Sequence, residues 1–266
     1  MRATPASIDE QFVVTTRLEK GVLAETMARA GQALIGDTPP NGKRYWAARF
    51  WDRDSAERHP VLAGDFLSQK NTIARYLQTY AAGAHTSVEF ACGTGEFTRL
   101  TALHTNVATM RTLDISARAL EIARNRVDHP DLQLVQGDFW ADNGLEPSDL
   151  VVCVDAIHHL GDIREVLTRL RTFVKPGGTF IGNVFTVDNF HEFERRRYGR
   201  LEHTWRTALF LGTAMAVKLS AGKLYTGSHR TQLKPGAYTV NLLGEIFDEV
   251  LEVTVDPYFT AFACRA

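Results

Sequence analysis

The sequence predicts a doubly wound α/β domain built on a mostly parallel sheet. Between residues 87 and 185, short apolar runs rich in β-branched residues alternate with segments of helical periodicity, as in successive β-α-β units. The uninterrupted apolar run LVVCV at 150–154 is typical of a central strand that is buried on both faces. A helix-strand-strand pattern follows at 238–266. Together these observations favour one sheet with helices on both faces.

The segments that flank this pattern are mostly helical. Upstream, two stretches with apolar residues near helical spacing lie on either side of an aromatic, charged loop at 43–60. Downstream, a largely helical segment separates the alternating region from the final strands. We therefore predict an N-terminal helical cap over residues 1–80 and the α/β domain over residues 81–266. A cap or lid insertion is expected within that domain, at about 191–234.

Composition disfavours several classes of partner. The 266 residues carry a formal net charge of -1, and the pI is about 6.8, so no overall field attracts nucleic acid or an anionic membrane. The three cysteines are far apart in the chain, as expected for reduced core residues of a cytoplasmic protein. The sequence shows neither the apolar run of a secretory signal nor one long enough to span a bilayer. We expect a cytoplasmic protein without nucleic-acid or membrane partners; the oligomeric state is left open.

A glycine-rich turn follows the first apolar run of the alternating region. The stretch SVEFACGTGEF at 87–97 passes from a strand pattern through Gly93 and Gly95 into a helix pattern. Such a turn offers unpaired backbone N–H groups at the positive end of a helix, and small residues let a ligand approach the main chain. It is not the dinucleotide fingerprint, because Thr98 stands where a third glycine is needed, and no phosphate-loop lysine follows. The turn predicts a nucleotide-type ligand without a pyrophosphate; a tight connection with no ligand is the alternative.

Acidic residues end the next two strand patterns. Asp114 follows Gly95 by 19 residues, and the ends of neighbouring parallel strands line one crevice, so its carboxylate could accept hydrogen bonds from both hydroxyls of a ribose. Alternatively, Asp114 caps the helix that begins directly after it. Asp138 ends the third strand pattern. It could accept a hydrogen bond from an adenine amino group while the backbone N–H of Phe139 faces a ring nitrogen; the alternative is a polar loop residue.

These elements, in this order, resemble the motifs of the class I S-adenosylmethionine-dependent methyltransferases. The family's acid and its G-x-G-x-G turn have counterparts in Glu89, Ala91, Gly93 and Gly95. Alanine replaces the first glycine, which puts in question how closely the main chain meets the methionine part. Further along, VDAIHHL resembles the fourth motif and VKPGGTFIGNVF resembles the segment that leads into the fifth strand. The resemblance covers roughly residues 70–190 and 237–266.

This resemblance implies a Rossmann-like, seven-stranded sheet and a cofactor, S-adenosylmethionine, that leaves as S-adenosylhomocysteine. By the same resemblance, Asp114 would bind the ribose, and Asp138 with Phe139 would bind the adenine. The residues predicted to line the cofactor site are Glu89, Ala91, Gly93, Gly95, Asp114, Ile115, Asp138, Phe139 and Asp155.

The acceptor is predicted to be a small molecule. Family members that methylate base amines usually carry an Asn/Asp-Pro-Pro-Tyr/Phe run in the fourth motif, and VDAIHHL lacks it. Methyl transfer to an O, N or C nucleophile of a small molecule, as in natural-product tailoring within secondary metabolism, is therefore favoured. His158 and His159 follow the fourth strand and are the candidate catalytic groups, with His158 preferred as a base; simple packing roles are the alternative. The side chains of Tyr45, His191, Tyr225 and His229 could also reach the site.

Two other functions stay open at this point. The basic run FERRRYGRLEH at 193–203 could dock RNA or a protein substrate, although interleaved acids suit a solvated helix face. A non-catalytic, cofactor-binding regulator could share the fold. The spacing of cysteines and histidines predicts no zinc site, and the acids predict no magnesium site.

Overall fold

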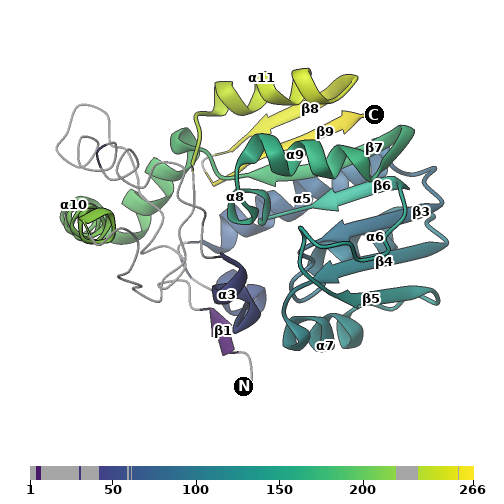
Figure 1. Cartoon of the computed structure of the whole chain (residues 1–266), viewed down its shortest axis with the longest axis horizontal. Coiled ribbons are helices and arrows are strands. Elements are labelled where there is room, and N and C mark those ends of the chain that lie inside the picture. Colours follow the sequence, from purple (N-terminus) through teal and green to yellow (C-terminus); the bar gives the residue numbers. More distant parts are fainter. Residues whose placement is uncertain are drawn as a thin grey trace.

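A seven-stranded sheet forms the centre of the protein in the computed structural model, which describes residues 4–6, 30, 42–58, 60, 62–219, 233–256 and 258–266. The strands are β3 (Thr86–Phe90), β4 (Thr109–Asp114), β5 (Leu132–Gln136), β6 (Ser148–Cys153), β7 (Val174–Val184), β8 (Glu249–Val255) and β9 (Thr260–Arg265). Their order is β5-β4-β3-β6-β7-β9-β8 (Figure 1), and only β9 is antiparallel to its neighbours. The predicted mostly parallel, seven-stranded sheet is confirmed.

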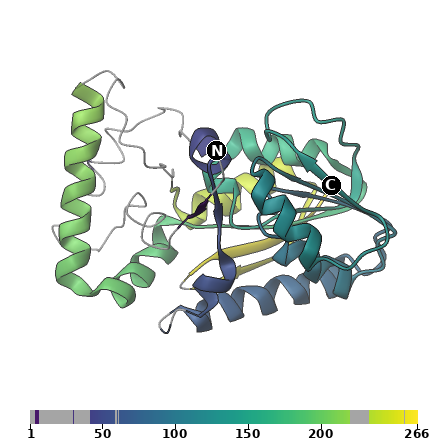
Figure 2. The ribbon, with the colours of Figure 1, turned by 90° about the horizontal axis from the view of Figure 1, so that it is seen from below.

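Helices cover both faces of this sheet (Figures 1 and 2). The helices are α5 (Ala63–Tyr80), α6 (Glu96–His104), α7 (Ala117–Arg126), α8 (Ile157–Leu160), α9 (Ile163–Thr172) and α11 (Gly236–Ile246). Successive residues of β6 point to opposite faces. Leu150 and Val152 pack with α5 and α6 in one core, and Val151 and Cys153 pack with α9 and α11 in the other. The run LVVCV is thus buried on both faces, as its composition predicts.

The N-terminal segment contributes both to the sheet layers and to a separate small unit. Strands β1 (Thr4–Ala6) and β2 (Arg49–Trp51) pair in parallel, and the short helices α3 (Gly42–Ala47) and α4 (Arg53–Glu57) flank β2. The stretch predicted as a loop at 43–60 therefore contains two helices and a strand. Helix α5 packs against α6, β7 and β9, so it belongs to the layer over the sheet. The division of domains at residue 80 stays a prediction.

Helix α10 (Val187–Leu219) is the described part of the predicted insertion, and residues 220–232 lie outside the description. It follows β7 and changes direction at Gly199, where φ is 75° and ψ is 167°, a conformation that glycine adopts readily. A backbone bridge between Thr186 and Lys234 brings the two ends of the insertion together. Despite the length of α10, no helix in the described ranges is both long and apolar enough to cross a membrane.

Candidate active site

The carboxyl ends of the parallel strands open into a cavity of about 690 Å³. It lies at the point where the strand order reverses between β3 and β6, which is where open α/β sheets bind their ligands. The segment from α3 to α4 forms the opposite wall. Of the nine predicted cofactor-binding residues, those that line the cavity are Ala91, Gly93, Asp114, Ile115, Asp138, Phe139 and Asp155. Glu89 and Gly95 are not among the lining residues.

The two glycines of the turn have different surroundings. Gly93 and Gly95 both have positive φ, 55° and 80°. A Cβ added at Gly93 would meet no heavy atom within 4 Å, whereas one at Gly95 would lie 2.8 Å from the Cβ of Ala123 in α7. Gly93 therefore borders open cavity, and Gly95 allows α6 and α7 to pack closely. Ala91, in place of the family's first glycine, has φ of 54°, a left-handed conformation that costs a non-glycine residue about 1–2 kcal/mol.

Glu89 is buried behind the turn and supports it. Its Oε2 accepts a hydrogen bond of 2.5 Å from the Thr98 hydroxyl of α6. Burial raises the pKa of Glu89 to about 8, and the nearby Asp114 and Glu96 add to the increase, against the opposing effect of Thr98. The carboxyl group is therefore mostly protonated at neutral pH. It joins β3 to α6 and is not among the residues that line the cavity.

Glu89 should give the protein a pH-dependent stability. Its folded pKa of about 8 lies above the unfolded value of about 4.3, so its contribution is complete below the unfolded pKa and is lost as pH rises through the folded pKa. Within that window the free energy of unfolding should fall by up to about 1.4 kcal/mol per pH unit. Glu89→Gln, which imitates the protonated form, should flatten this slope in urea denaturation series across the window. Equal slopes in the two proteins would contradict a protonated Glu89.

Asp114 connects the glycine turn to the next helix. Its Oδ2 accepts a hydrogen bond from the Gly93 N–H and its Oδ1 accepts one from the Ser116 N–H, both at 2.8 Å. The cap of α7 is Ser116, whose hydroxyl accepts from the Ala119 N–H, so Asp114 is not itself the helix cap. Burial raises the pKa of the Asp114 carboxyl, while the backbone donors oppose that increase. The carboxylate holds the turn in place and lines the cavity.

Asp138 is joined to the opposite wall of the cavity. Its Oδ1 accepts from the Trp140 N–H at 3.1 Å, and its Oδ2 lies 2.6 Å from the Nζ of Lys43 in α3. Phe139 is buried beside it, and its carbonyl accepts from the Arg169 guanidinium at 2.8 Å. Sequence reasoning did not select Lys43, for which the charged character of 43–60 was the only available signal.

The two candidate histidines occupy different positions. His158 is 2% exposed and does not line the cavity; its Nδ1 accepts from the Phe185 N–H at 3.4 Å. His159 does line the cavity, and its ring centroid lies 5.4 Å from that of Trp46 in α3. The geometry thus favours His159 over His158 as the group that faces an acceptor. The other four predicted acceptor-side residues, Tyr45, His191, Tyr225 and His229, have side chains outside the described part of the structure.

A buried arginine that the sequence did not indicate holds Asp155 at the floor of the cavity. The Nη1 of Arg53 donates to the Asp155 Oδ2 at 2.9 Å and to the Gln69 Oε1 at 2.6 Å, and its side chain is 3% exposed. The other Asp155 oxygen accepts from the amides of Gln69 and Asn183, at 2.7 and 3.0 Å. Asp155 has φ of 57°, a conformation that persists only where surrounding contacts impose it.

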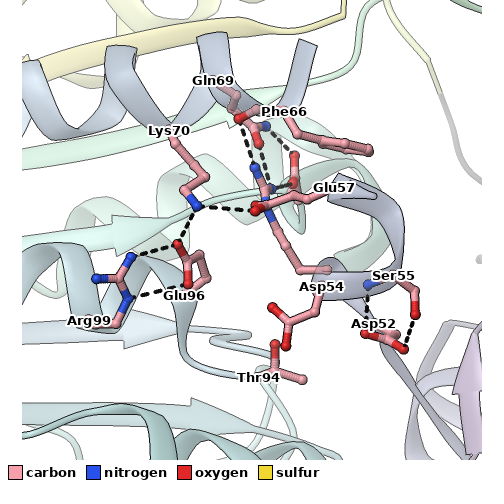
Figure 3. Close-up of polar contacts among 12 residues, drawn as sticks. Asp52, Asp54, Ser55, Glu57, Phe66, Gln69, Lys70, Thr94, Glu96 and Arg99 are labelled. Atoms are coloured by element: carbon pink, nitrogen blue, oxygen red, sulfur yellow. Dashed lines mark hydrogen bonds and ion pairs between the residues drawn. The ribbon is translucent and has the colours of Figure 1, made fainter. Parts of the chain in front are cut away.

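An ion-pair chain continues from this arginine to the glycine turn (Figure 3). Glu57 accepts from the Arg53 Nε at 2.8 Å, and Lys70 bridges Glu57 and Glu96 at 3.1 and 2.9 Å. Glu96 begins α6, directly after Gly95. The N-terminal segment is therefore tied to the floor of the cavity and to the helix that follows the turn. Within the described residues, no group of three or more His, Cys, Asp or Glu side chains is placed to hold a metal ion.

Comparison with known proteins agrees with this geometry. The profile of a methyltransferase domain family matches residues 88–180. Malonyl-[acyl-carrier protein] O-methyltransferase of Halalkalibacterium halodurans is 32% identical over 110 residues, which are 40% of this chain and 41% of that protein. Trans-aconitate 2-methyltransferase of Paracidovorax citrulli is 30% identical over 174 residues, 64% of this chain and 59% of that protein. The matched part of the chain thus spans less than two thirds of either relative.

A solved structure supports the fold over most of the chain. The N-methyltransferase NodS of Bradyrhizobium japonicum WM9, in complex with S-adenosylhomocysteine, superposes with a TM-score of 0.53 at 16% identity and covers 89% of this chain and 97% of its own. The strand order, the glycine turn and the matched domain all lead to the same family. Residues 88–180 match the methyltransferase domain family, and the findings together indicate a class I methyltransferase with S-adenosylmethionine as its cofactor.

Proposed function

We propose that the protein transfers the methyl group of S-adenosylmethionine to a carboxylate oxygen of a small, acidic molecule. The observation that carries this proposal is the continuous cavity that extends from the glycine turn to a wall containing Trp46, Arg49 and Trp51. A concave site of this size, with an aromatic wall that contains a guanidinium, suits a small anionic acceptor better than a macromolecule. Natural-product tailoring and the cytoplasmic location remain predictions that go with this function.

The cofactor end of the cavity fits S-adenosylmethionine. The open space over Gly93 gives a ligand access to the backbone. Asp114 and Asp138 line the same cavity, which supports the proposal that they accept hydrogen bonds from the ribose hydroxyls and the adenine amino group. The carboxylates of Asp114 and Asp138 also favour a cationic ligand such as the sulfonium cofactor. When bound, the cofactor supplies a methyl group on a sulfonium centre, which is already a strong electrophile.

The acceptor end lies between α3, β2 and α8. There Trp46 approaches His159 across the cavity, and Arg49 and Trp51 lie on the same wall. A guanidinium binds a carboxylate in a fixed, bidentate geometry, so Arg49 would orient the acceptor, while the aromatic side chains would hold its body and exclude water. A carboxylate oxygen needs no base to become a nucleophile, so His159 would position the acceptor. The names of the two relatives specify a malonyl group on an acyl-carrier protein and trans-aconitate, both of which carry a carboxylate.

Asp114 provides the sharpest test of the cofactor end. Asp114→Ala should weaken S-adenosylmethionine binding by about 1–3 kcal/mol, because charge-assisted hydrogen bonds to the ribose are lost. Titration calorimetry measures this change. The matched control is Asp131→Ala, an exposed aspartate at the amino end of β5, which should bind the cofactor normally. Unchanged affinity in Asp114→Ala would remove the ribose assignment.

The acceptor is tested separately. Release of S-adenosylhomocysteine should be measured with a panel of small carboxylic acids and with their methyl esters and primary amides as matched controls. We expect turnover with acids alone, and an increase of about tenfold or more in KM for the acid in Arg49→Met, with partial recovery in Arg49→Lys. Cofactor binding with turnover only on amines or phenols would overturn the carboxylate assignment and leave the methyltransferase assignment intact. No cofactor binding would overturn both.

A further inference from the structure

The part of α10 beyond Gly199 carries an exposed apolar face. Figures 1 and 2 both show this part at the side of the molecule away from the sheet. Among its large apolar side chains, Leu201 is 90% exposed, Trp205 is 68% exposed and Leu219 is 83% exposed. Monomeric proteins seldom expose several large apolar side chains in one continuous patch. This helix therefore has a surface whose composition suits a protein interior.

These residues lie on one side of the helix. At 3.6 residues per turn, positions 201, 205, 209, 215 and 219 fall within about one third of the helix circumference. These positions hold Leu201, Trp205, Leu209, Met215 and Leu219, and each of these side chains is about half exposed or more. His203 and Thr207, which lie on the opposite side, are buried. The helix thus packs through one face and presents the other, which we call the α10 face, to solvent.

We propose that the α10 face is the interface between two copies of this chain, which pair through antiparallel α10 helices about a two-fold axis near Leu209. In a two-fold arrangement the same surface serves both partners, so it must be complementary to itself. The α10 face meets this condition because a large side chain and a notch lie on either side of Leu209. Trp205 precedes Leu209 by one turn, and Gly212, where an added Cβ would meet no atom within 4 Å, follows by one turn. In an antiparallel pair, each Trp205 approaches the Gly212 notch of the other copy.

The size of the face also suits a second copy. The five side chains span about 27 Å of helix, and their exposed parts amount to several hundred Å², the order of the ~800 Å² per partner that a stable interface buries. One polar pair at its edge is satisfied within the helix, since Glu202 accepts from the Arg206 Nε at 3.0 Å. The apolar residues of the face thus remain as the surface that a partner would cover.

The first experiment is sedimentation velocity over a concentration series. We expect the wild-type chain to sediment as a dimer, and Trp205→Glu and Leu219→Glu each to raise the dimer dissociation constant at least tenfold. The matched control is Leu103→Glu, since Leu103 of α6 is 61% exposed and lies off the α10 face; this variant should remain a dimer. A wild-type monomer at the highest concentration would overturn the proposal, as would a dimer that both α10 variants leave intact.

Cross-linking tests the placement of the axis. All three native cysteines are buried, so Leu209→Cys introduces an exposed thiol on the α10 face. Under mild oxidation we expect a covalent dimer with Leu209→Cys and none with Leu103→Cys. Equal cross-linking by both variants would contradict the arrangement. The alternative occupant is a lipid surface: a wild-type monomer that co-sediments with anionic phospholipid vesicles through Trp205 would overturn the dimer in its favour. None of these measurements depends on methyltransferase activity.

Discussion

Replacing Arg53 with alanine is expected to destabilise the folded protein by about 3–5 kcal/mol, the usual cost of removing one partner from a buried ion pair. Arg53 is 3% exposed, and its guanidinium donates to Asp155, Glu57, Gln69 and the Phe66 carbonyl. Without it, the carboxylate of Asp155 would stay in a low-dielectric site with only amide donors. The lost ring contacts of the guanidinium with Phe66, at 5.0 Å from the centroid, add to the cost.

Urea denaturation at neutral pH measures this loss. Two variants serve as controls. Lys70→Ala removes a partly exposed member of the same ion-pair chain and should cost only about 1 kcal/mol. Arg53→Ala combined with Asp155→Asn should be less destabilised than the two single changes added together, because the second change removes the unpaired charge. If Arg53→Ala cost no more than Lys70→Ala, the buried pair would not be what holds the N-terminal segment to the cavity floor.

Sequence periodicity predicts the sheet because the signal is local. The alternation of strand and helix patterns, and the apolar run of β6, depend on residues within one element and its neighbours. The cofactor end of the site can be predicted for a similar reason. Gly93, Asp114 and Asp138 lie at the ends of successive strands, and parallel strands bring their carboxyl ends together. Each of these residues lines the cavity in the structure.

The features of the site that the sequence did not predict depend on contacts between segments far apart in the chain. Arg53 and Asp155 are 102 residues apart in the chain, and no local pattern shows that they pair. The choice between His158 and His159 is a different case, since adjacent residues on the short helix α8 point about 100° apart. Only the packing of α8 against Trp46 on one side and Phe185 on the other determines which ring borders the cavity.

Gly93→Ala is expected to lose mainly cofactor affinity, and Gly95→Ala is expected to lose mainly stability. Each variant adds one methyl group at a residue with positive φ, so each should lose about 1–2 kcal/mol of stability from backbone strain. At Gly95 the new Cβ would also meet the Cα and Cβ of Ala123, at 3.0 and 2.8 Å. Backbone cannot swing away as a flexible side chain can, so α6 and α7 must separate, at a further cost of about 1–3 kcal/mol.

At Gly93 the same methyl group enters open cavity, so the fold should survive while S-adenosylmethionine affinity falls tenfold or more, because the ligand can no longer approach the main chain. Urea denaturation and titration calorimetry on both variants separate the two effects. Since the added group and the backbone region are the same, any difference reflects what surrounds each glycine. Normal binding by Gly93→Ala would mean that the cofactor does not approach the turn at this residue. A Gly95→Ala protein as stable as Gly93→Ala would mean that the α6–α7 contact can relax.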